Sequence, residues 1–450
     1  MAIGFEAAGA IRPGRRAATT AADDRPDPTD PTDPTGRTGQ SGRIALPGYA
    51  RGAVVLAIAA LPLLTPSFAG NSGPVDLFIV FAIGCVLFAA CSEHVLVRLP
   101  LALPVWLSLI AGALGAAVHD RLPHSALMLA QDLLMLLWGG AVATAAQHGP
   151  TLSSLMRWWT RAGVASAFLL IVGVVAGVKK LSGYTPRETN RAAFLFGDPN
   201  RCGLYLMLAF LIMRAAQYPS RPIIRYACCA TVLVATLLTG SNAAIAGLAV
   251  AVVAAAFVSA GRRGGVVKLV AVGSVATVLA GTAVLSLNVG QTSDSAGNVG
   301  ILANNLGRAT KSTDSRSTIL QENWRLYLDN DPFGLGPDGT KDTLKQQGAG
   351  YVKEAHNDYI AAANERGVLG MAALLLFVAL VGVRAARLMS LHPPRHLTEH
   401  VPRPDVLGAT ALGVAVTAAF HQTLHFRHEW AFLGLLAGAA LLAVRGRQAR

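Results

Sequence analysis

The stretch from Ser312 to Gly370 decides how the rest of the chain is read. It is water-compatible, it lies between strongly apolar runs, and it holds four short motifs. These motifs are Ser315-Arg316, Pro332-Phe333-Gly334-Leu335-Gly336, Ala355-His356-Asn357-Asp358-Tyr359 and Glu365-Arg366-Gly367-Val368-Leu369-Gly370. Nearly everything else from Arg51 onward is apolar enough for a membrane. We therefore expect most functional side chains to lie in this stretch.

The composition around this stretch is that of a membrane protein. Of 450 residues, 53% are hydrophobic and 14% are charged. A bilayer core needs about 20 apolar residues per helix, and such runs recur to the C-terminus. We therefore predict an all-α polytopic integral membrane protein with about twelve transmembrane helices and one long extracytoplasmic helical loop. The spans are expected near residues 52–70, 74–92, 99–118, 125–146, 162–178, 200–216, 224–240, 242–260, 266–288, 366–386, 405–422 and 429–445.

The distribution of charge predicts the topology. A net charge of +13 could suggest nucleic acid, but in a membrane chain the placement of Lys and Arg matters more, and we expect no nucleic acid partner. One alternate set of short loops is rich in arginine: Arg98, Arg157, Arg161, Arg214, Arg221, Arg225, Arg262, Arg263, Arg384, Arg387, Arg395, Arg445 and Arg447. By the positive-inside rule these loops and both termini are cytoplasmic, and the 289–365 loop faces outward. Lys179, Lys180, Arg187 and Arg191 break the bias, which suggests an anionic ligand on the outer side.

Four segments follow from these patterns. Residues 1–50 are rich in Arg, Pro, Thr and Asp and are expected to be a disordered cytoplasmic tail without an apolar signal-peptide core. Residues 51–288 hold the first nine spans, residues 289–365 form the outward-facing loop that carries most of the motifs, and residues 366–450 hold the last three spans and a short tail. The five cysteines lie in or beside apolar spans and predict no disulfide framework.

Two helices are expected within the long loop. Leu320, Trp324 and Leu328 recur every fourth residue and predict an amphipathic helix over 318–328. Asp314 or Ser315 can cap its start, which would hold Arg316 at the membrane surface. A second helix is expected to begin near Lys353 and to run into the tenth span.

The four motifs, read together as SR…W…P-x-G-x-G…HN-x-Y…E-x-G-x-x-G, resemble the large extracytoplasmic loop of the O-antigen ligase and polymerase superfamily. A second signature of that superfamily, R…G-x-F-x-(D/N)-P-N, is similar to the stretch from Arg191 to Asn200, although the glycine before the aromatic pair is missing. A third signature, T-G-S-R, reads Thr239-Gly240-Ser241-Asn242 here. Asparagine has replaced the cation, so we assign no phosphate contact to that turn.

The resemblance implies a GT-C-like architecture and a membrane glycosyltransferase. The function it favours is that of an O-antigen ligase, which moves a glycan from undecaprenyl diphosphate to lipid A–core oligosaccharide on the periplasmic side of the bacterial inner membrane. The implied reaction is metal-independent, needs no cofactor and inverts the anomeric centre. Arginine matches phosphate oxygens, and a histidine either accepts a proton near neutral pH or, as an imidazolium, binds the diphosphate. The implied catalytic residues are His356, Arg316 and Arg191, and the implied substrate-binding residues are Asn200, Asn357, Tyr359, Lys180 and Arg308.

Other functions stay open at this point. An O-antigen or exopolysaccharide polymerase and a protein O-oligosaccharyltransferase of the same superfamily would use the same donor. Polymerases usually carry two sizeable outward loops, whereas this chain has one, which favours the ligase. A twelve-span secondary transporter is the alternative from another class, but internal repeats and interrupted helices in matching halves are not seen. In every case membrane lipids surround the protein, and in the ligase case the acceptor is lipid A–core or another lipid or protein.

Three further groups of residues each allow a functional and a purely structural interpretation. His421, His425 and His428 with Glu429 have spacing that suits zinc, but imidazoles at a helix end more often hydrogen-bond carbonyls or line a polar vestibule. Asp329-x-Asp331 imitates the D-x-D of metal-dependent transferases but stands at a helix stop before proline. Asp132, beside Gln131, lies within the fourth span, where a carboxylate serves either function or a helix-packing hydrogen bond.

Overall fold

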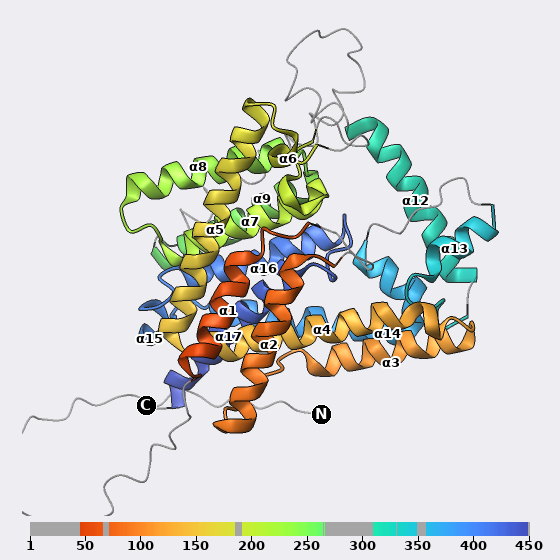
Figure 1. Ribbon diagram of the computed structural model, residues 1–450, viewed down its shortest axis with the longest axis horizontal. Coiled ribbons are helices and arrows are strands. Elements are labelled where there is room, and N and C mark those ends of the chain that lie inside the picture. The colour runs from red at the N-terminus through yellow and green to blue at the C-terminus, as the bar shows by residue number, and fades with distance from the viewer. Residues whose placement is uncertain are drawn as a thin grey trace, which may run out of the picture. The chain divides into compact units, whose positions relative to one another are not determined.

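The computed structural model describes residues 46–65, 72–184, 191–263, 265, 309–329, 331–348 and 357–448, and in these ranges every regular element is a helix (Figure 1). The elements are α1 (Gly48–Ala60), α2 (Pro74–Ser92), α3 (Ala102–Val118), α4 (Leu122–Ala146), α5 (Gly149–Val175), α6 (Lys179–Ser182), η2 (Phe194–Phe196), α7 (Pro199–Ala216), α8 (Pro222–Leu238), α9 (Asn242–Arg263), α12 (Ala309–Asp329), α13 (Gly339–Gln346), α14 (Asp358–Leu388), α15 (Arg395–Thr398), α16 (Pro404–Ala418) and α17 (Arg427–Gln448). The predicted all-α fold is confirmed.

Six of the described helices are long and apolar enough to cross a membrane. They are Pro74–Ser92, Ser125–Ala146, Gly149–Val175, Asn242–Arg262, Asp358–Leu388 and Arg427–Val444. Four shorter apolar helices, α1, α3, α8 and α16, accompany them. The chain is therefore a polytopic membrane protein, as expected. The ninth predicted span, residues 266–288, and most of the N-terminal tail lie outside the described residues.

Two of the first five spans differ clearly from the prediction. Helix α1 covers Gly48–Ala60 rather than 52–70, since Pro62 follows at once and cannot donate to a helical ladder. Helix α5 begins at Gly149, with Pro150 in its first turn, rather than at residue 162. Arg157 and Arg161 therefore lie within α5 and not in a loop. Arg161 Nε donates to the Tyr218 hydroxyl at 3.1 Å.

The ends of the helices contact each other in two groups. At the ends predicted to face outward, Arg427 Nε donates to Asp76 at 2.9 Å, and Asp358 accepts from Thr423 N at 2.8 Å. At the opposite ends, Arg262 pairs with Asp405 at 3.0 Å. The predicted spans place the first group on one side of the membrane and the second group on the other. The contacts therefore fit helices that cross the membrane alternately up and down.

Helix α12 is longer than the predicted helix over 318–328. It begins at Ala309, so Asp314 and Ser315 lie inside it and cannot cap its start. The physical reason is that no glycine or proline interrupts the chain between Gly307 and Pro332. The predicted end holds, because the helix stops at Asp329.

Helix α14 begins later than predicted, at Asp358 rather than near Lys353. The Asn357 side chain caps it by accepting from Tyr359 N at 2.9 Å and Ile360 N at 3.2 Å. An asparagine that caps a helix has an extended backbone, so the helix cannot continue through it. Residues 349–356, which precede the cap, lie outside the described part of the chain.

A glycine kink in α14 holds the Pro332–Gly336 loop. Gly367 has φ 60° and ψ −155°, a conformation open in practice to glycine alone, and it interrupts the helical ladder. Val368 N–H is thereby free to donate to the Pro332 carbonyl at 2.9 Å, and Leu335 N–H donates to the Asn364 carbonyl at 2.8 Å. The glycines of the two motifs therefore meet.

The same loop passes against α3 on its other side. A Cβ built on Gly115 of α3 would lie 2.8 Å from the carbonyl oxygens of Phe333 and Gly334. In addition, the Ser125 hydroxyl of α4 donates to the Pro337 carbonyl at 3.0 Å. The loop is thus packed among α3, α4 and α14, which gives a fixed cover at this end of those helices.

Candidate functional site

Arg191 joins two segments that are distant in the sequence. Its Nε donates to the Thr239 carbonyl at 3.0 Å, and its Nη2 donates to Asn200 Oδ1 at 2.9 Å. Ser241 Oγ also donates to Asn200 Oδ1, at 3.2 Å. The α8–α9 turn and the start of α7 are therefore joined through one arginine. We name Arg191, Asn200, Thr239 and Ser241 the arginine node.

The start of α7 is capped by the side chain of Asp198. Asp198 accepts from Asn200 N at 2.8 Å and from Arg201 N at 3.0 Å, with Pro199 in the first turn. On its other side, Asp198 Oδ1 lies 4.0 Å from His421 Nε2. The cap therefore connects the arginine node with the α16–α17 turn, residues 419–426.

The Asn357-Asp358-Tyr359 motif fastens the same turn. Asn357 Nδ2 donates to the Ala419 carbonyl at 2.9 Å, and the Tyr359 hydroxyl donates to the Ala415 carbonyl at 3.3 Å. Asp358 is buried and accepts from both the backbone N–H and the hydroxyl of Thr423 at 2.8 Å. These three side chains hold the turn in place.

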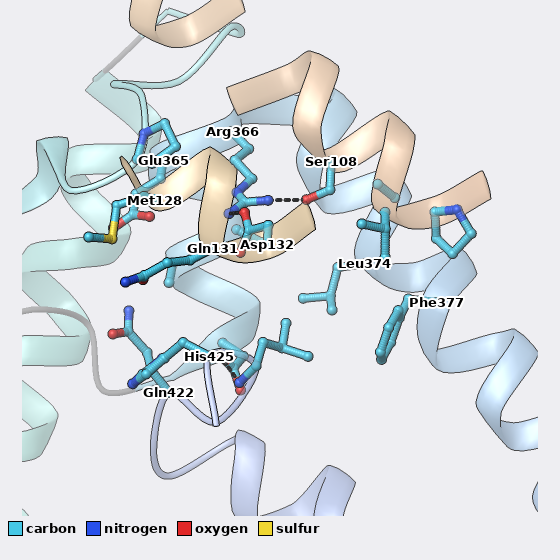
Figure 2. A pocket seen from close by; sticks show the side chains of 18 of the residues that line it. Ser108, Met128, Gln131, Asp132, Glu365, Arg366, Leu374, Phe377, Gln422 and His425 are labelled. Carbon is cyan, nitrogen blue, oxygen red and sulfur yellow. Dashed lines mark hydrogen bonds and ion pairs between the residues drawn. The ribbon is translucent and has the colours of Figure 1, made fainter. Parts of the chain in front are cut away.

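A cavity of about 560 Å³ lies beside the turn, among α3, α4, α14, α17 and the loop before α13 (Figure 2). Arg366 Nη2 pairs with Asp132 Oδ2 at 2.5 Å in its wall, and Arg366 Nη1 donates to the Ser108 hydroxyl. Figure 2 shows Gln131, Gln422 and His425 gathered on one side, with Leu374 and Phe377 on the other. Asp132, for which the sequence left two readings open, therefore has an ion-pair partner from α14.

Acidic groups outnumber basic groups in the cavity wall. Its acidic residues are Asp132, Asp338, Asp358 and Glu365, and its basic residues are Lys341 and Arg366. Burial first, and then the charges of Arg201 and His421, hold the pKa of His425 well below its usual value of 6.5. At neutral pH that imidazole is uncharged and presents one donor and one acceptor.

The histidines of this region pack on aromatic rings rather than around a common centre. His428 lies edge-on to Phe196 and to Tyr205, each at 5.9 Å between ring centroids, and His425 lies edge-on to Phe426 at 4.6 Å. Within the described ranges, no group of three metal-ligating side chains is close enough to hold an ion. Of the three, His425 lines the cavity, whereas His428 is buried among the rings.

The structure describes some of the predicted site residues and not others. Arg191 and Asn200 lie together in the arginine node, and Asn357 and Tyr359 lie together at the turn. Lys180 is exposed on α6. Arg316 lies in α12, and its side chain is outside the described part of the chain. His356 and Arg308 are outside the described residues altogether.

The sequence reading overlooked Arg366 and Gln422. A signal for Arg366 existed, since a carboxylate in the fourth span requires a cation or a donor from another helix. For Gln422 there was none, because its position depends on how Asp358 fastens the turn.

The fold and these sites define a polytopic membrane protein with polar sites at one end of its helices. Residues 227–375 match the family model of the O-antigen ligases. This match confirms the resemblance found in the motifs and supports an O-antigen ligase-type family member, which implies a glycosyltransferase-like enzyme. In general terms the family suggests a polyprenyl-linked glycan and a lipid acceptor. The comparison with curated proteins gave no match.

Proposed function

We propose that this protein is an O-antigen ligase, which transfers a glycan from undecaprenyl diphosphate to a sugar of lipid A–core on the periplasmic face of the inner membrane. The observation that supports this proposal best is the arginine node. Two segments that resemble signatures of the superfamily, Arg191 to Asn200 and Thr239 to Asn242, are held together by the contacts of Arg191 with Thr239 and Asn200. The node also lies in the loop set whose cations broke the positive-inside bias.

The proposed reaction needs charge neutralisation and one proton transfer. An acceptor hydroxyl oxygen attacks the anomeric carbon and forms the new glycosidic bond, while the bond from that carbon to the diphosphate oxygen breaks. Undecaprenyl diphosphate leaves with the electron pair, and Arg191 and Arg316 neutralise its charge. His356 takes the proton of the hydroxyl. In this proposal no metal ion takes part, because arginine forks bind the diphosphate.

Arg191 provides the test. Cells that lack the gene should show no lipopolysaccharide ladder, and the intact gene should restore it. Arg191→Ala should accumulate in the membrane but lower kcat/KM of the purified enzyme by about 10- to 150-fold, the loss expected when a charge-assisted contact is removed. Arg191→Lys should recover little, because a single ammonium cannot reproduce the two-sided fork.

Arg225 is the matched control, since it also donates to backbone carbonyls, those of Gln217 and Pro219, but at the opposite end of α8. Arg225→Ala should keep the ladder. A full ladder with Arg191→Lys, or equal losses from Arg191→Ala and Arg225→Ala, would contradict the role given to the arginine node. An unchanged ladder in the deletion strain would overturn the proposed function itself.

A further inference from the structure

The cavity beside the α16–α17 turn is electrostatically unlike the arginine node. Four acidic side chains and two basic ones line it. Its arginine is already engaged, because Arg366 pairs with Asp132 at 2.5 Å and donates to Ser108. A diphosphate would find the guanidinium of this wall already paired with a carboxylate. The ligand that fits is uncharged.

The walls of the cavity match an uncharged, hydroxyl-rich ligand. Gln131 and Gln422 bring amides, each with donors and an acceptor, to one side (Figure 2). His425 adds a neutral imidazole on the same side. Leu374 and Phe377 form an apolar surface opposite, where the C–H face of a sugar ring can rest. Convergent polar groups against an apolar wall are typical of small-molecule sites.

The size of the cavity limits the ligand. At about 560 Å³ it falls inside the range of roughly 300–1,000 Å³ found for small-molecule sites. One sugar or a short saccharide fits this volume, whereas a long glycan does not. The end of an acceptor oligosaccharide is therefore a better occupant than the polymeric donor chain.

The α16–α17 turn connects this cavity with the arginine node. His421 Nε2 lies 4.0 Å from Asp198, two residues before Asn200 of the node. The next residue in the chain, Gln422, lines the cavity. Two ligands bound on either side of the turn would thus be neighbours, which transfer between them requires. Asn357, which follows the predicted base His356, is bonded to the same turn.

We propose that this cavity is a saccharide subsite that binds the terminal neutral sugar of the acceptor, with Gln131, Gln422 and His425 as its hydrogen-bonding groups. This proposal rests on the proposed function, and it adds the place and the chemistry of acceptor recognition. The donor diphosphate is bound elsewhere, at the arginine node.

The test separates acceptor recognition from donor recognition. The purified enzyme is assayed with lipid A–core that lacks O-antigen, and KM is measured separately for this acceptor and for the donor. Gln422→Ala should raise the acceptor KM by about three- to tenfold, since one hydrogen bond is lost, with the donor KM unchanged. Ala362→Phe should raise it further, because Ala362 lines the cavity and a phenyl ring would fill part of it.

Ala372→Phe is the control on the same helix, since Ala372 is exposed and does not line the cavity. It should leave both KM values unchanged. Direct binding of lipid A–core and of lipid A without core is measured in parallel. Wild-type protein should bind the first more tightly, and Gln422→Ala should reduce the difference.

Two results would overturn the inference: an unchanged acceptor KM in both cavity variants, or equal affinity of the wild type for lipid A with and without core. Absence of transfer by the wild type would instead count against the proposed function. The binding measurement would then still decide whether the cavity takes a saccharide.

Discussion

Asp358 shows how much one buried carboxylate can fix. It accepts three hydrogen bonds from the α16–α17 turn, two from Thr423 and one from Leu424 at 3.5 Å. Its neighbour Asn357 both caps α14 and donates to Ala419. A pair of adjacent side chains therefore sets the position of Gln422 and His425, which line the cavity. At this scale the motif acts by positioning other residues.

His425 leads to a prediction about pH. Its pKa is held well below 6.5 by burial and by nearby cations, Arg201 and Arg427 among them. The unfolded chain therefore binds this proton before the folded chain does, so the contribution to stability is present above pH 6.5 and is lost as pH falls below it. We expect the wild type to lose stability between pH 6.5 and 5 more steeply than His425→Gln, by up to about 1.4 kcal/mol per pH unit.

Unfolding of the detergent-solubilised protein, followed at half-unit steps of pH, measures this difference. His392→Gln is the comparison variant, because His392 lies in the loop between α14 and α15, away from the turn. It should keep the wild-type slope. Parallel curves for wild type and His425→Gln would mean that the imidazole is not kept neutral by folding.

At the scale of elements, the kink at Gly367 is the feature that organises the outer end of α14. The kink releases Val368 N–H for Pro332 and admits the Pro332–Gly336 loop between α14 and α3. Arg366, directly before the kink, reaches Asp132 of α4. Three helices and one loop thus depend on a single backbone conformation.

Replacement of Gly367 tests this dependence. Gly367→Ala should destabilise the protein by about 1–3 kcal/mol for the strained backbone alone, because an alanine rarely adopts φ 60° with ψ −155°. The added Cβ would also overlap the Pro332 carbonyl oxygen. The measurement is the thermal midpoint of unfolding, together with glycan transfer in membranes.

Gly382 of the same helix is the matched control, since a Cβ there meets nothing within 4 Å. Gly382→Ala should be neutral, or stabilising by up to about 1 kcal/mol, because alanine favours a helix. If both substitutions had the same small effect, the kink would not be the element that secures the loop.

The sequence predicted local features better than distant ones. The stop at Asp329 and most apolar spans were found because each depends on neighbouring residues. The start of α14 was misplaced by five residues, because helical spacing was followed back through Asn357, whose side chain instead caps the helix. The docking of the Pro332–Gly336 loop on Gly367 joins two motifs that were recognised separately. Glycine patterns identify flexible points but not what fills them.

At the scale of the whole molecule, the helix ends separate into two groups that match the predicted alternation of spans. The outer group includes the Arg121–Asp342 pair at 2.5 Å, which ties the α3–α4 connection to the long loop. The inner group includes the contacts of Arg262 with Asp405 and Ser390. The orientation of these two groups across the membrane is a prediction of the charge bias.

Cysteine labelling decides that orientation. An impermeant thiol reagent applied to intact cells should label a cysteine introduced at Gly348, after α13, but not one at Gly446, near the end of α17. The native cysteines are first replaced by alanine, since Cys91 is exposed. Permeabilised cells supply the comparison in which both positions react. Labelling of a cysteine at position 446 in intact cells would contradict the predicted orientation.

The Asp132–Arg366 pair has a consequence for how the protein is made. The two residues are 234 positions apart in the chain. At roughly 5–20 residues per second, a ribosome that has finished Asp132 needs about 10–50 s to reach Arg366. During that interval α4 carries a carboxylate in the membrane without its eventual cation, which is unfavourable in hydrocarbon. The carboxylate of α4, an early helix, is thus paired only after the late helix α14 has been inserted.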